Sequence, residues 1–267
     1  MIKHIFSDMD GTLLNSTGRI SSVNIKRIND SQIPFTLVSA RAPMEMTEVI
    51  DKLHLNSPQI AFNGGLIFKK NKDDLEILAD DPLDIGIVKK IINYITINFK
   101  DISCSCYDSN NWYSEKIDDG TRYETLLTGQ IPKIVNYANL FTEGINIYKI
   151  MLIDFGKLKL KTLEQKLNSL NLNVSIKQTG LNYLEITNVK AKKSRGIKYI
   201  QDLENISKDE MAAFGDGHND LPMFASVGTP IVMENALDEI KAYGKFITQT
   251  NDENGVAFGI EKYLEVN

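Results

Sequence analysis

Short apolar segments that alternate with amphipathic helices constrain the fold of this chain most strongly. Such units form βαβ crossovers, in which the strands run parallel. The pattern therefore predicts an α/β fold with a doubly wound, Rossmann-like parallel sheet at its core. The expected elements of that core are strands at 2–7, 35–39, 59–62, 211–214 and 230–233, helices at 21–31, 46–53 and 194–203, and a final helix opened by 251–256.

The middle of the chain has a different pattern of charged and apolar residues. Residues 69–84 are charged and contain Pro82, which indicates a crossing between domains. Beyond it a helix followed by paired strands occurs twice, which predicts an antiparallel sheet with helices on one face. The expected elements are helices at 83–99, 119–127 and 157–170 and strands at 102–107, 112–115, 146–153, 174–178 and 183–187. We therefore predict a core in two parts, 1–82 and 189–267, and an inserted α+β cap at 83–188.

The first predicted strand runs into an acidic turn, whose residues are Asp8, Met9, Asp10, Gly11 and Thr12. Two carboxylates at the end of one strand are expected to lie close together, and like charges at short range resist being ionised together. A bound cation removes that conflict. In an open parallel sheet the carboxyl ends of the strands are also where ligands bind. The turn is therefore a candidate catalytic site rather than a simple hairpin connection.

A second acidic loop follows the strand at 211–214. Gly215 and Gly217 begin like a dinucleotide-binding fingerprint, but Asp220 stands where the third glycine is required and would repel a pyrophosphate. Asp216 and Asp220 instead form a second acidic pair at the same edge of the sheet as Asp8. Oxygen ligands without histidine or cysteine favour Mg²⁺. Such a cluster also needs positive charge, which Lys193 can supply.

The composition of the chain limits the classes of molecule that the protein is expected to bind. The formal net charge of the 267 residues is −5 and no basic stripe is present, which argues against nucleic acid. No apolar run approaches a membrane span, and the carboxylates near the start interrupt any signal peptide. The only cysteines, Cys104 and Cys106, lack metal-ligand partners nearby in sequence, so we expect reduced side chains in a cytoplasmic protein. We expect a monomer or weak homodimer that binds a small-molecule phosphate ester.

At this point the residues match a known family. The chain resembles the haloacid dehalogenase superfamily, and within it the Cof-type sugar-phosphate phosphatases with a large α/β cap. The resemblance covers the whole core in order, whereas the inserted segment matches only in length and element order. The matching positions are Asp8-Met-Asp10-Gly-Thr12, Ser39, Asn63-Gly64, Lys193, Gly215-Asp216-Gly-His-Asn219-Asp220, Asn235-Ala236 and 251–256.

The resemblance implies a Mg²⁺-dependent phosphatase. By analogy, Asp8 attacks the phosphorus and forms an aspartyl-phosphate, and Asp10 serves as general acid and then as general base. Asp8, the backbone carbonyl of Asp10 and Asp216 hold the metal. The remaining positions have binding or supporting roles. Thr12, Ser39, Lys193 and Asn219 bind phosphoryl oxygens, and Asp220, Arg41 and Asn63 support the site.

Other functions remain open from the sequence alone. A sugar phosphomutase of the same fold would use the same residues and return the phosphoryl group to another hydroxyl. A dehalogenase has no use for a second acid such as Asp10. A phosphoacceptor signalling domain also combines clustered aspartates, a hydroxyl and a lysine, but it needs no inserted cap. The substrate depends on cap residues that the sequence does not identify.

Overall fold

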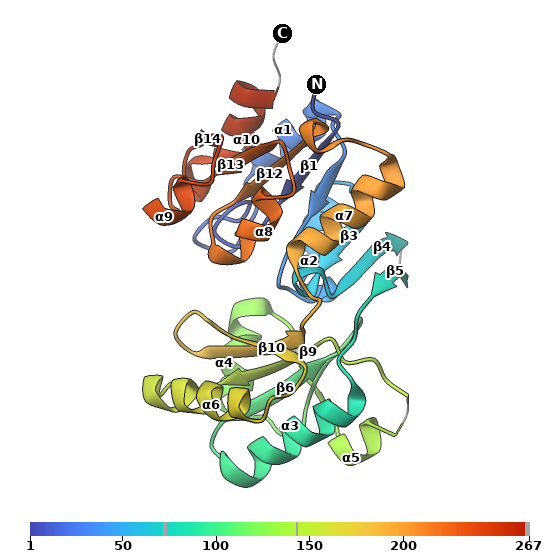
Figure 1. The fold of residues 1–267 in the computed structure, drawn as a ribbon, viewed down its shortest axis with the longest axis vertical. Helices are drawn as coiled ribbons and strands as arrows, with labels where there is room; N and C mark the ends of the chain where they lie inside the picture. Colours follow the sequence, from blue (N-terminus) through green and yellow to red (C-terminus); the bar gives the residue numbers. More distant parts are fainter. Residues whose placement is uncertain (72–73, 143, 265–267) are drawn as a thin grey trace. The chain divides into compact units, whose positions relative to one another are not determined.

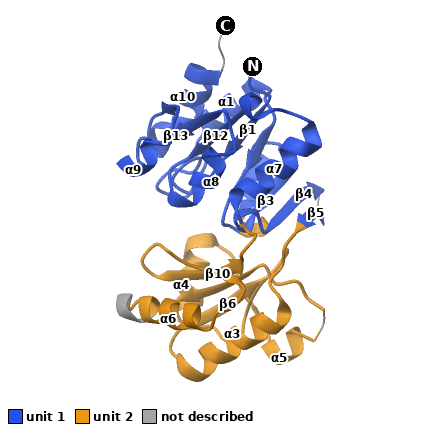
Figure 2. Cartoon of the chain, in the orientation of Figure 1, with its two compact units in different colours: residues 1–41, 46–79, 192–267 blue, residues 42–45, 80–191 orange. Residues whose placement is uncertain are grey.

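The computed structural model describes residues 1–71, 74–142 and 144–264. The chain divides into two compact units, and Figure 2 colours them separately. The first unit comprises 1–41, 46–79 and 192–267, and the second comprises 42–45 and 80–191. The first unit is thus assembled from both ends of the chain, and the second is made almost entirely from its middle.

A five-stranded parallel sheet forms the centre of the first unit, in the order β14-β13-β12-β1-β2 (Figure 1). An isolated parallel bridge from Val38 to Ile60 continues it toward β3, which belongs to a three-stranded sheet with β4 and β5. The strands are β1 (His4–Ser7), β2 (Phe35–Leu37), β3 (Gln59–Ala61), β4 (Leu66–Asn71), β5 (Asp74–Asp80), β12 (Met211–Gly215), β13 (Thr229–Val232) and β14 (Phe246–Ile247).

Helices cover both faces of the parallel sheet. On one face α7 packs against α8, and the apolar cluster there includes Phe6, Ala213 and Ile197. On the other face α1 packs against α10, where the Ala257 amide donates to the Asn24 side chain at 3.0 Å. The helices of this part are α1 (Ser22–Ser31), α2 (Pro43–Lys52), α7 (Lys193–Glu204), α8 (Leu221–Phe224), α9 (Asp238–Lys241) and α10 (Gly255–Gly259). The predicted doubly wound parallel core is confirmed.

The second unit contains a six-stranded sheet in the order β10-β11-β9-β6-β7-β8. All neighbours are antiparallel except β7 and β8. Apolar residues of α3 and α6 bury one face of this sheet, together with the inward residues of β6, β9 and β11. The helix α4 lies on the opposite face, where its Gly120 lies against Ser103 and Ile153, so the expectation of helices on one face is wrong for the helix at 119–127. The strands are β6 (Ser103–Tyr107), β7 (Trp112–Ser114), β8 (Lys133–Ile134), β9 (Lys149–Ile153), β10 (Val174–Thr179) and β11 (Tyr183–Asn188); the helices are α3 (Ile85–Asn98), α4 (Asp119–Thr128), α5 (Tyr137–Leu140) and α6 (Lys157–Ser169).

The largest difference from the predicted elements lies between 69 and 84. The sequence pattern gives a charged connection there, but the structure has the end of β4 and the whole of β5. Most side chains of β5 are exposed or half-buried, so the strand lacks the apolar alternation by which a half-buried strand is recognised. The short elements β8, α5, α9 and β14 were also not predicted, because elements of two to four residues carry too little periodicity.

Candidate active site

Three neighbouring strands of the parallel sheet deliver the polar residues of the candidate site. Asp8 follows β1, Ser39 lies just beyond the end of β2, and Asp216 follows β12. β1 pairs in parallel with both β2 and β12, so the carboxyl ends of the three strands meet at one edge. The parallel register thus brings together residues that are far apart in the sequence.

The loop after β1 is shaped by a tight turn. The amides of Thr12 and Leu14 both donate to the carbonyl of Met9, at 3.3 and 2.8 Å. Gly11 has a φ of +75°, and an added Cβ would overlap the Asp216 carboxylate. Glycine is therefore required here for two reasons, its left-handed backbone and its lack of a side chain.

Lys193 lies between two buried carboxylates. Its Nζ is 2.7 Å from Asp8 Oδ1 and 2.6 Å from Asp220 Oδ1. The lysine is only 1% exposed and Asp8 is 6% exposed. Burial raises the pKa of Asp8 well above its ordinary value, because it disfavours the carboxylate, and the lysine charge opposes this effect. Burial alone would lower the pKa of Lys193, but the two aspartates outweigh it and raise it.

Asp220 holds the second acidic loop in place. Its Oδ2 accepts hydrogen bonds from the amides of Asp216 and Gly217, both at 2.9 Å. An added Cβ at Gly215 would come within 2.6 Å of the Asp220 carboxyl carbon, so this residue can only be glycine if the carboxylate is to reach the loop. Both oxygens of Asp220 therefore have partners, and its geometry fits positioning of Lys193 and of the loop.

Asp216 is held from the other side. The Thr12 hydroxyl donates to Asp216 Oδ1 at 2.6 Å. The pKa of Asp216 is raised to about 6, chiefly because burial disfavours the carboxylate. The hydrogen bond from Thr12 acts in the opposite direction and lowers the pKa. Thr12, expected to bind a phosphoryl oxygen, thus directs its hydroxyl proton to a carboxylate in this structure.

Three carboxylates have the spacing of metal ligands. One oxygen from each of Asp8, Asp216 and Asp220 lies within 4.8 Å of the others. Within the described residues, Oδ2 of Asp8 and Oδ2 of Asp216 accept no hydrogen bond from protein. Hard carboxylate oxygens that crowd together in a half-buried site fit a Mg²⁺ ion by chemistry and by spacing. The raised pKa values of Asp8 and Asp216 fit the same view, because a cation would offset their mutual repulsion.

Asp10 is not part of this carboxylate cluster, contrary to the expected pairing of Asp8 with Asp10. Its exposed carboxylate accepts two hydrogen bonds from Arg41, one from Nε at 2.8 Å and one from Nη2 at 2.6 Å. Such a bidentate pair is geometrically specific.

The remaining predicted residues lie around this centre in different ways. Ser39 is fully buried, and its Oγ accepts from the Arg41 amide at 3.1 Å. Asn63 has a left-handed backbone with φ of +55°, donates its amide to the Ser39 carbonyl at 2.8 Å, and has a buried Oδ1 without a hydrogen-bond partner in the described chain. Asn219 is exposed, and its Oδ1 lies close above Gly217.

Two asparagines donate hydrogen bonds to carbonyls of the loop after β1. They were not predicted as site residues. Asn235 donates through Nδ2 to the Gly11 carbonyl at 2.8 Å, and its Oδ1 accepts from the Asn251 amide at 3.0 Å. Asn251 donates to the Leu14 carbonyl at 2.8 Å. Both lie in segments that match the superfamily, which was the only signal in the sequence. Their side chains connect the end of the chain to its beginning.

Comparison with known proteins shows the family to which the chain belongs. A family model for haloacid dehalogenase-like hydrolases matches residues 5–260, which is nearly the whole chain. The chain belongs to that family. Two bacterial relatives match along 98% of both sequences. One is a putative phosphatase from Haemophilus influenzae at 30% identity, and the other is 5-amino-6-(5-phospho-D-ribitylamino)uracil phosphatase YwtE from Bacillus subtilis at 31% identity.

Solved structures agree with this family assignment. A haloacid dehalogenase-like hydrolase from Bacteroides thetaiotaomicron superposes with a TM-score of 0.88 at 26% identity, covering 98% of this chain and 99% of the other. The protein is therefore a phosphatase, a phosphoric monoester hydrolase, as the motifs predict. None of the helices in the described part of the chain is long and apolar enough to span a membrane.

Proposed function

We propose that the protein is a Mg²⁺-dependent phosphatase of small phosphate monoesters that works through an aspartyl-phosphate on Asp8. The observation that carries the proposal is the buried Asp8 carboxylate, with Lys193 at 2.7 Å on one side and Asp216 within 4.8 Å. An ammonium and a metal-ready carboxylate around one nucleophile suit the approach of a phosphate dianion. Lys193 supplies a fixed positive charge where charge builds up on the transferring group.

Two displacements at phosphorus complete the proposed reaction. In the first, an oxygen of Asp8 attacks phosphorus, the bond from phosphorus to the ester oxygen breaks, and the leaving alcohol takes a proton from Asp10. In the second, water attacks the same phosphorus and gives a proton to Asp10, and the bond to Asp8 breaks. Inorganic phosphate leaves, and both aspartates return to their starting states.

The residues that would hold Mg²⁺ are Asp8, Asp216 and the backbone carbonyl of Asp10. When bound, the ion offsets repulsion between the carboxylate and the phosphate dianion. Asp220 has a different task, because its oxygens are already engaged by Lys193 and by two loop amides. Its contribution is to hold the ammonium and the loop in register with Asp8.

Arg41 donates two hydrogen bonds to Asp10 in its carboxylate form. That form is the one needed to accept a proton from water in the second displacement. For the first displacement Asp10 must carry a proton, so binding of the ester has to loosen the pair with Arg41. Ser39, Asn63 and Asn219 supply polar groups from the neighbouring loops for the phosphoryl oxygens.

The second unit is proposed to act as the cap that selects the alcohol part of the substrate. Its sheet face opposite α3 and α6 carries charged groups that its apolar core does not use. Lys149 Nζ lies 3.6 Å from a Glu185 oxygen, and the Tyr183 hydroxyl donates to Glu124 at 2.8 Å. Such groups favour substrates rich in hydroxyls or polar heteroatoms, such as sugar phosphates or phosphorylated cofactor precursors. The name of the Bacillus subtilis relative belongs to the second class.

Separate substitutions of the two aspartates test the mechanism. Asp8→Asn removes the nucleophile, so neither phosphorylated protein nor turnover is expected. Asp10→Asn keeps the nucleophile but loses proton transfer, which contributes typically ~10²–10⁴-fold. An acyl phosphate has a good leaving group and should still phosphorylate the Asp10 variant, in which the intermediate then accumulates. Turnover by the Asp8→Asn variant, or label on any residue other than Asp8, would refute the mechanism.

A panel of phosphate esters assayed with Mg²⁺ identifies the substrate class and tests the cap. Lys149→Met is expected to change the order of kcat/KM among the esters, whereas hydrolysis of a minimal aryl phosphate should change little. Product analysis separates the phosphatase from a phosphomutase. Release of free phosphate supports the proposal, and an isomerised sugar phosphate without free phosphate contradicts it.

A further inference from the structure

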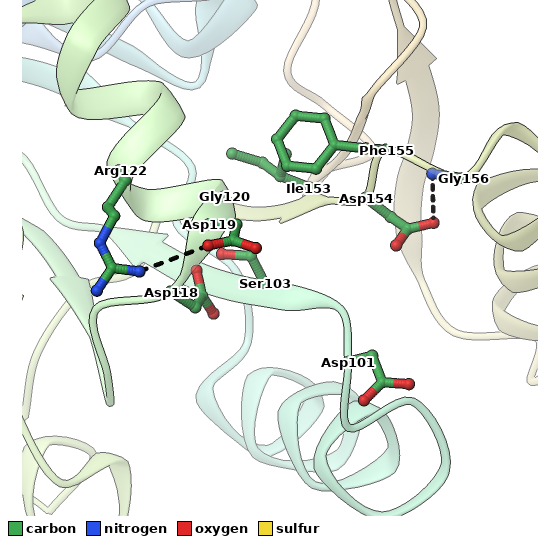
Figure 3. A pocket seen from close by; sticks show the side chains of 10 residues that line it. All are labelled: Asp101, Ser103, Asp118, Asp119, Gly120, Arg122, Ile153, Asp154, Phe155 and Gly156. Atoms are coloured by element: carbon green, nitrogen blue, oxygen red, sulfur yellow. Dashed lines mark hydrogen bonds and ion pairs between the residues drawn. The ribbon is translucent and has the colours of Figure 1, made fainter.

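The second unit contains a pocket that none of the proposed catalytic residues line. Figure 3 shows it at the start of β6, the end of β9 and the first turn of α4, with a volume of about 530 Å³. All of its lining residues belong to the second unit, so its geometry depends on that unit alone. Its chemistry differs from that of the site around Asp8.

Negative charge dominates the pocket. Four aspartates line it, Asp101, Asp118, Asp119 and Asp154, against one arginine, Arg122. The existing bonds use only part of their capacity. Asp118 accepts from the Thr121 amide at 3.0 Å, Asp154 accepts from the Gly156 amide at 3.0 Å, and Asp119 has Arg122 at 3.5 Å. A carboxylate has about four lone-pair sites, so each can accept a further donor. Lys116 Nζ lies 3.9 Å from Asp118 Oδ2, and the lining residues still carry an excess of negative charge, which favours a cationic ligand.

The arrangement of the carboxylates argues against a metal ion. They come from three separate parts of the unit, before β6, at the start of α4 and after β9 (Figure 3). Among the described residues, the set of carboxylates with metal-ligand spacing is Asp8, Asp216 and Asp220, and no set from this pocket has it. Negative charges spread around a cavity suit a cation whose positive charges are also spread out.

Ser103 adds an observation that is independent of the charges. It lines the pocket and is only 4% exposed, and its hydroxyl forms no hydrogen bond with any residue that the structure describes. Gly120 permits this arrangement, since an added Cβ there would lie 2.6 Å from Ser103 Oγ. The hydroxyl oxygen is not among the fully enclosed side-chain atoms of the described residues that lack a partner, so it is accessible from the pocket. A donor group on a ligand in the pocket would satisfy it.

The pocket also has an apolar wall. Ile153 and Phe155 line it, and the Phe155 residue is 51% exposed. Tyr123 packs against Phe155 with the two rings perpendicular and their centroids 5.3 Å apart. An aromatic face that is fixed in this way can contact methylene groups and attract a nearby ammonium. The wall and the carboxylates together match alternating methylene and ammonium groups.

We propose that this pocket binds a linear polyamine, a chain of methylenes that carries two or more protonated amines. The ammonium groups bind the dispersed carboxylates, one of them donates to Ser103 Oγ, and the methylenes lie against Ile153 and Phe155. The inference is independent of the proposed phosphatase mechanism, because no residue of the pocket takes part in it.

Equilibrium dialysis with spermidine tests the proposal on the full-length protein, with Mg²⁺ in excess and the ionic strength held constant. Saturable binding of one spermidine per chain is expected. The double variant Asp119→Asn with Asp154→Asn should bind about tenfold more weakly, since two charge contacts are lost. The carboxamide introduced at position 154 keeps an oxygen for the Gly156 amide. Ser103→Ala should weaken binding by about threefold through one lost hydrogen bond.

The double variant Asp202→Asn with Asp30→Asn is the matched control, because it removes the same number of charges and both carboxylates are exposed in the first unit. It should change the affinity by less than about twofold. Equal weakening by this control variant would refute the proposal, since binding would then follow net charge alone. Failure of spermidine to saturate, or unchanged affinity in the double variant, would overturn it as well. Displacement of spermidine by Ca²⁺ at low occupancy of the protein would assign the pocket to a metal ion instead.

Discussion

Replacing Lys193 with methionine should destabilise the first unit strongly. The ammonium is buried between Asp8 and Asp220 at 2.7 and 2.6 Å, and methionine fills similar space without the charge. Removing one partner of a buried ion pair leaves an uncompensated charge and costs about 3–5 kcal/mol of the free energy of unfolding. Urea unfolding followed by far-UV circular dichroism, near neutral pH and in EDTA, measures this loss.

Lys198→Met on the same helix provides the matched control. Lys198 forms an ion pair with Asp202 at 2.6 Å, but the side chains are 66% and 63% exposed. Exposed pairs contribute about 0–1 kcal/mol, so the two variants should differ by about 2–5 kcal/mol.

The effect of the Lys193→Met substitution should also depend on pH. Burial raises the pKa of Asp8, so protonation of this group in the folded state stabilises the protein at low pH, and that contribution is lost as the pH rises. Without the lysine the pKa rises further, and the loss of stability should be smaller in acid than at neutral pH. Equal losses for Lys193→Met and Lys198→Met at neutral pH would refute the reasoning.

Three further outcomes are expected. Gly64→Ala should destabilise the protein by more than the ~1 kcal/mol expected at an open left-handed glycine such as Gly18, because its Cβ would overlap the Lys192 carbonyl; thermal unfolding of both variants measures the difference. Asn235→Ala should lower kcat by about tenfold with little change in melting temperature, since the lost hydrogen bond to the Gly11 carbonyl only positions the loop, and unchanged kcat would contradict this role. Removal of divalent metal by EDTA should abolish phosphatase activity and added Mg²⁺ should restore it, whereas full activity in EDTA would contradict the proposed metal dependence.

The sequence allowed the architecture to be predicted where elements are long and periodic. The parallel core, the second sheet and the family were confirmed, whereas α4 lies on the face of the second sheet opposite α3 and α6. The exposed edge strand β5 was missed, because a strand that buries few side chains has no apolar pattern to recognise.

The candidate site was predictable only as a set of residues. Parallel strands bring Asp8, Ser39 and Asp216 to one edge, which follows from the βαβ pattern. The bonds among them do not follow, because each depends on side-chain rotamers and local turns. The Asp10 carboxylate accepts a hydrogen bond from Arg41 instead of joining Asp8, and the Thr12 hydroxyl donates to Asp216. The chemical roles of all these residues stay predictions until the variants are measured.

The crossings that lead into and out of the segment 80–191 differ in how much change of length they can tolerate. The outgoing chain leaves from the exposed strand β5, where added residues would displace no residue of the candidate site. The returning chain reaches the first unit at Lys192, whose carbonyl lies against Gly64, and the next residue is Lys193. One residue inserted there would move the ammonium away from both carboxylates. Exchange of the inserted unit for another should therefore succeed only when the returning junction keeps its length.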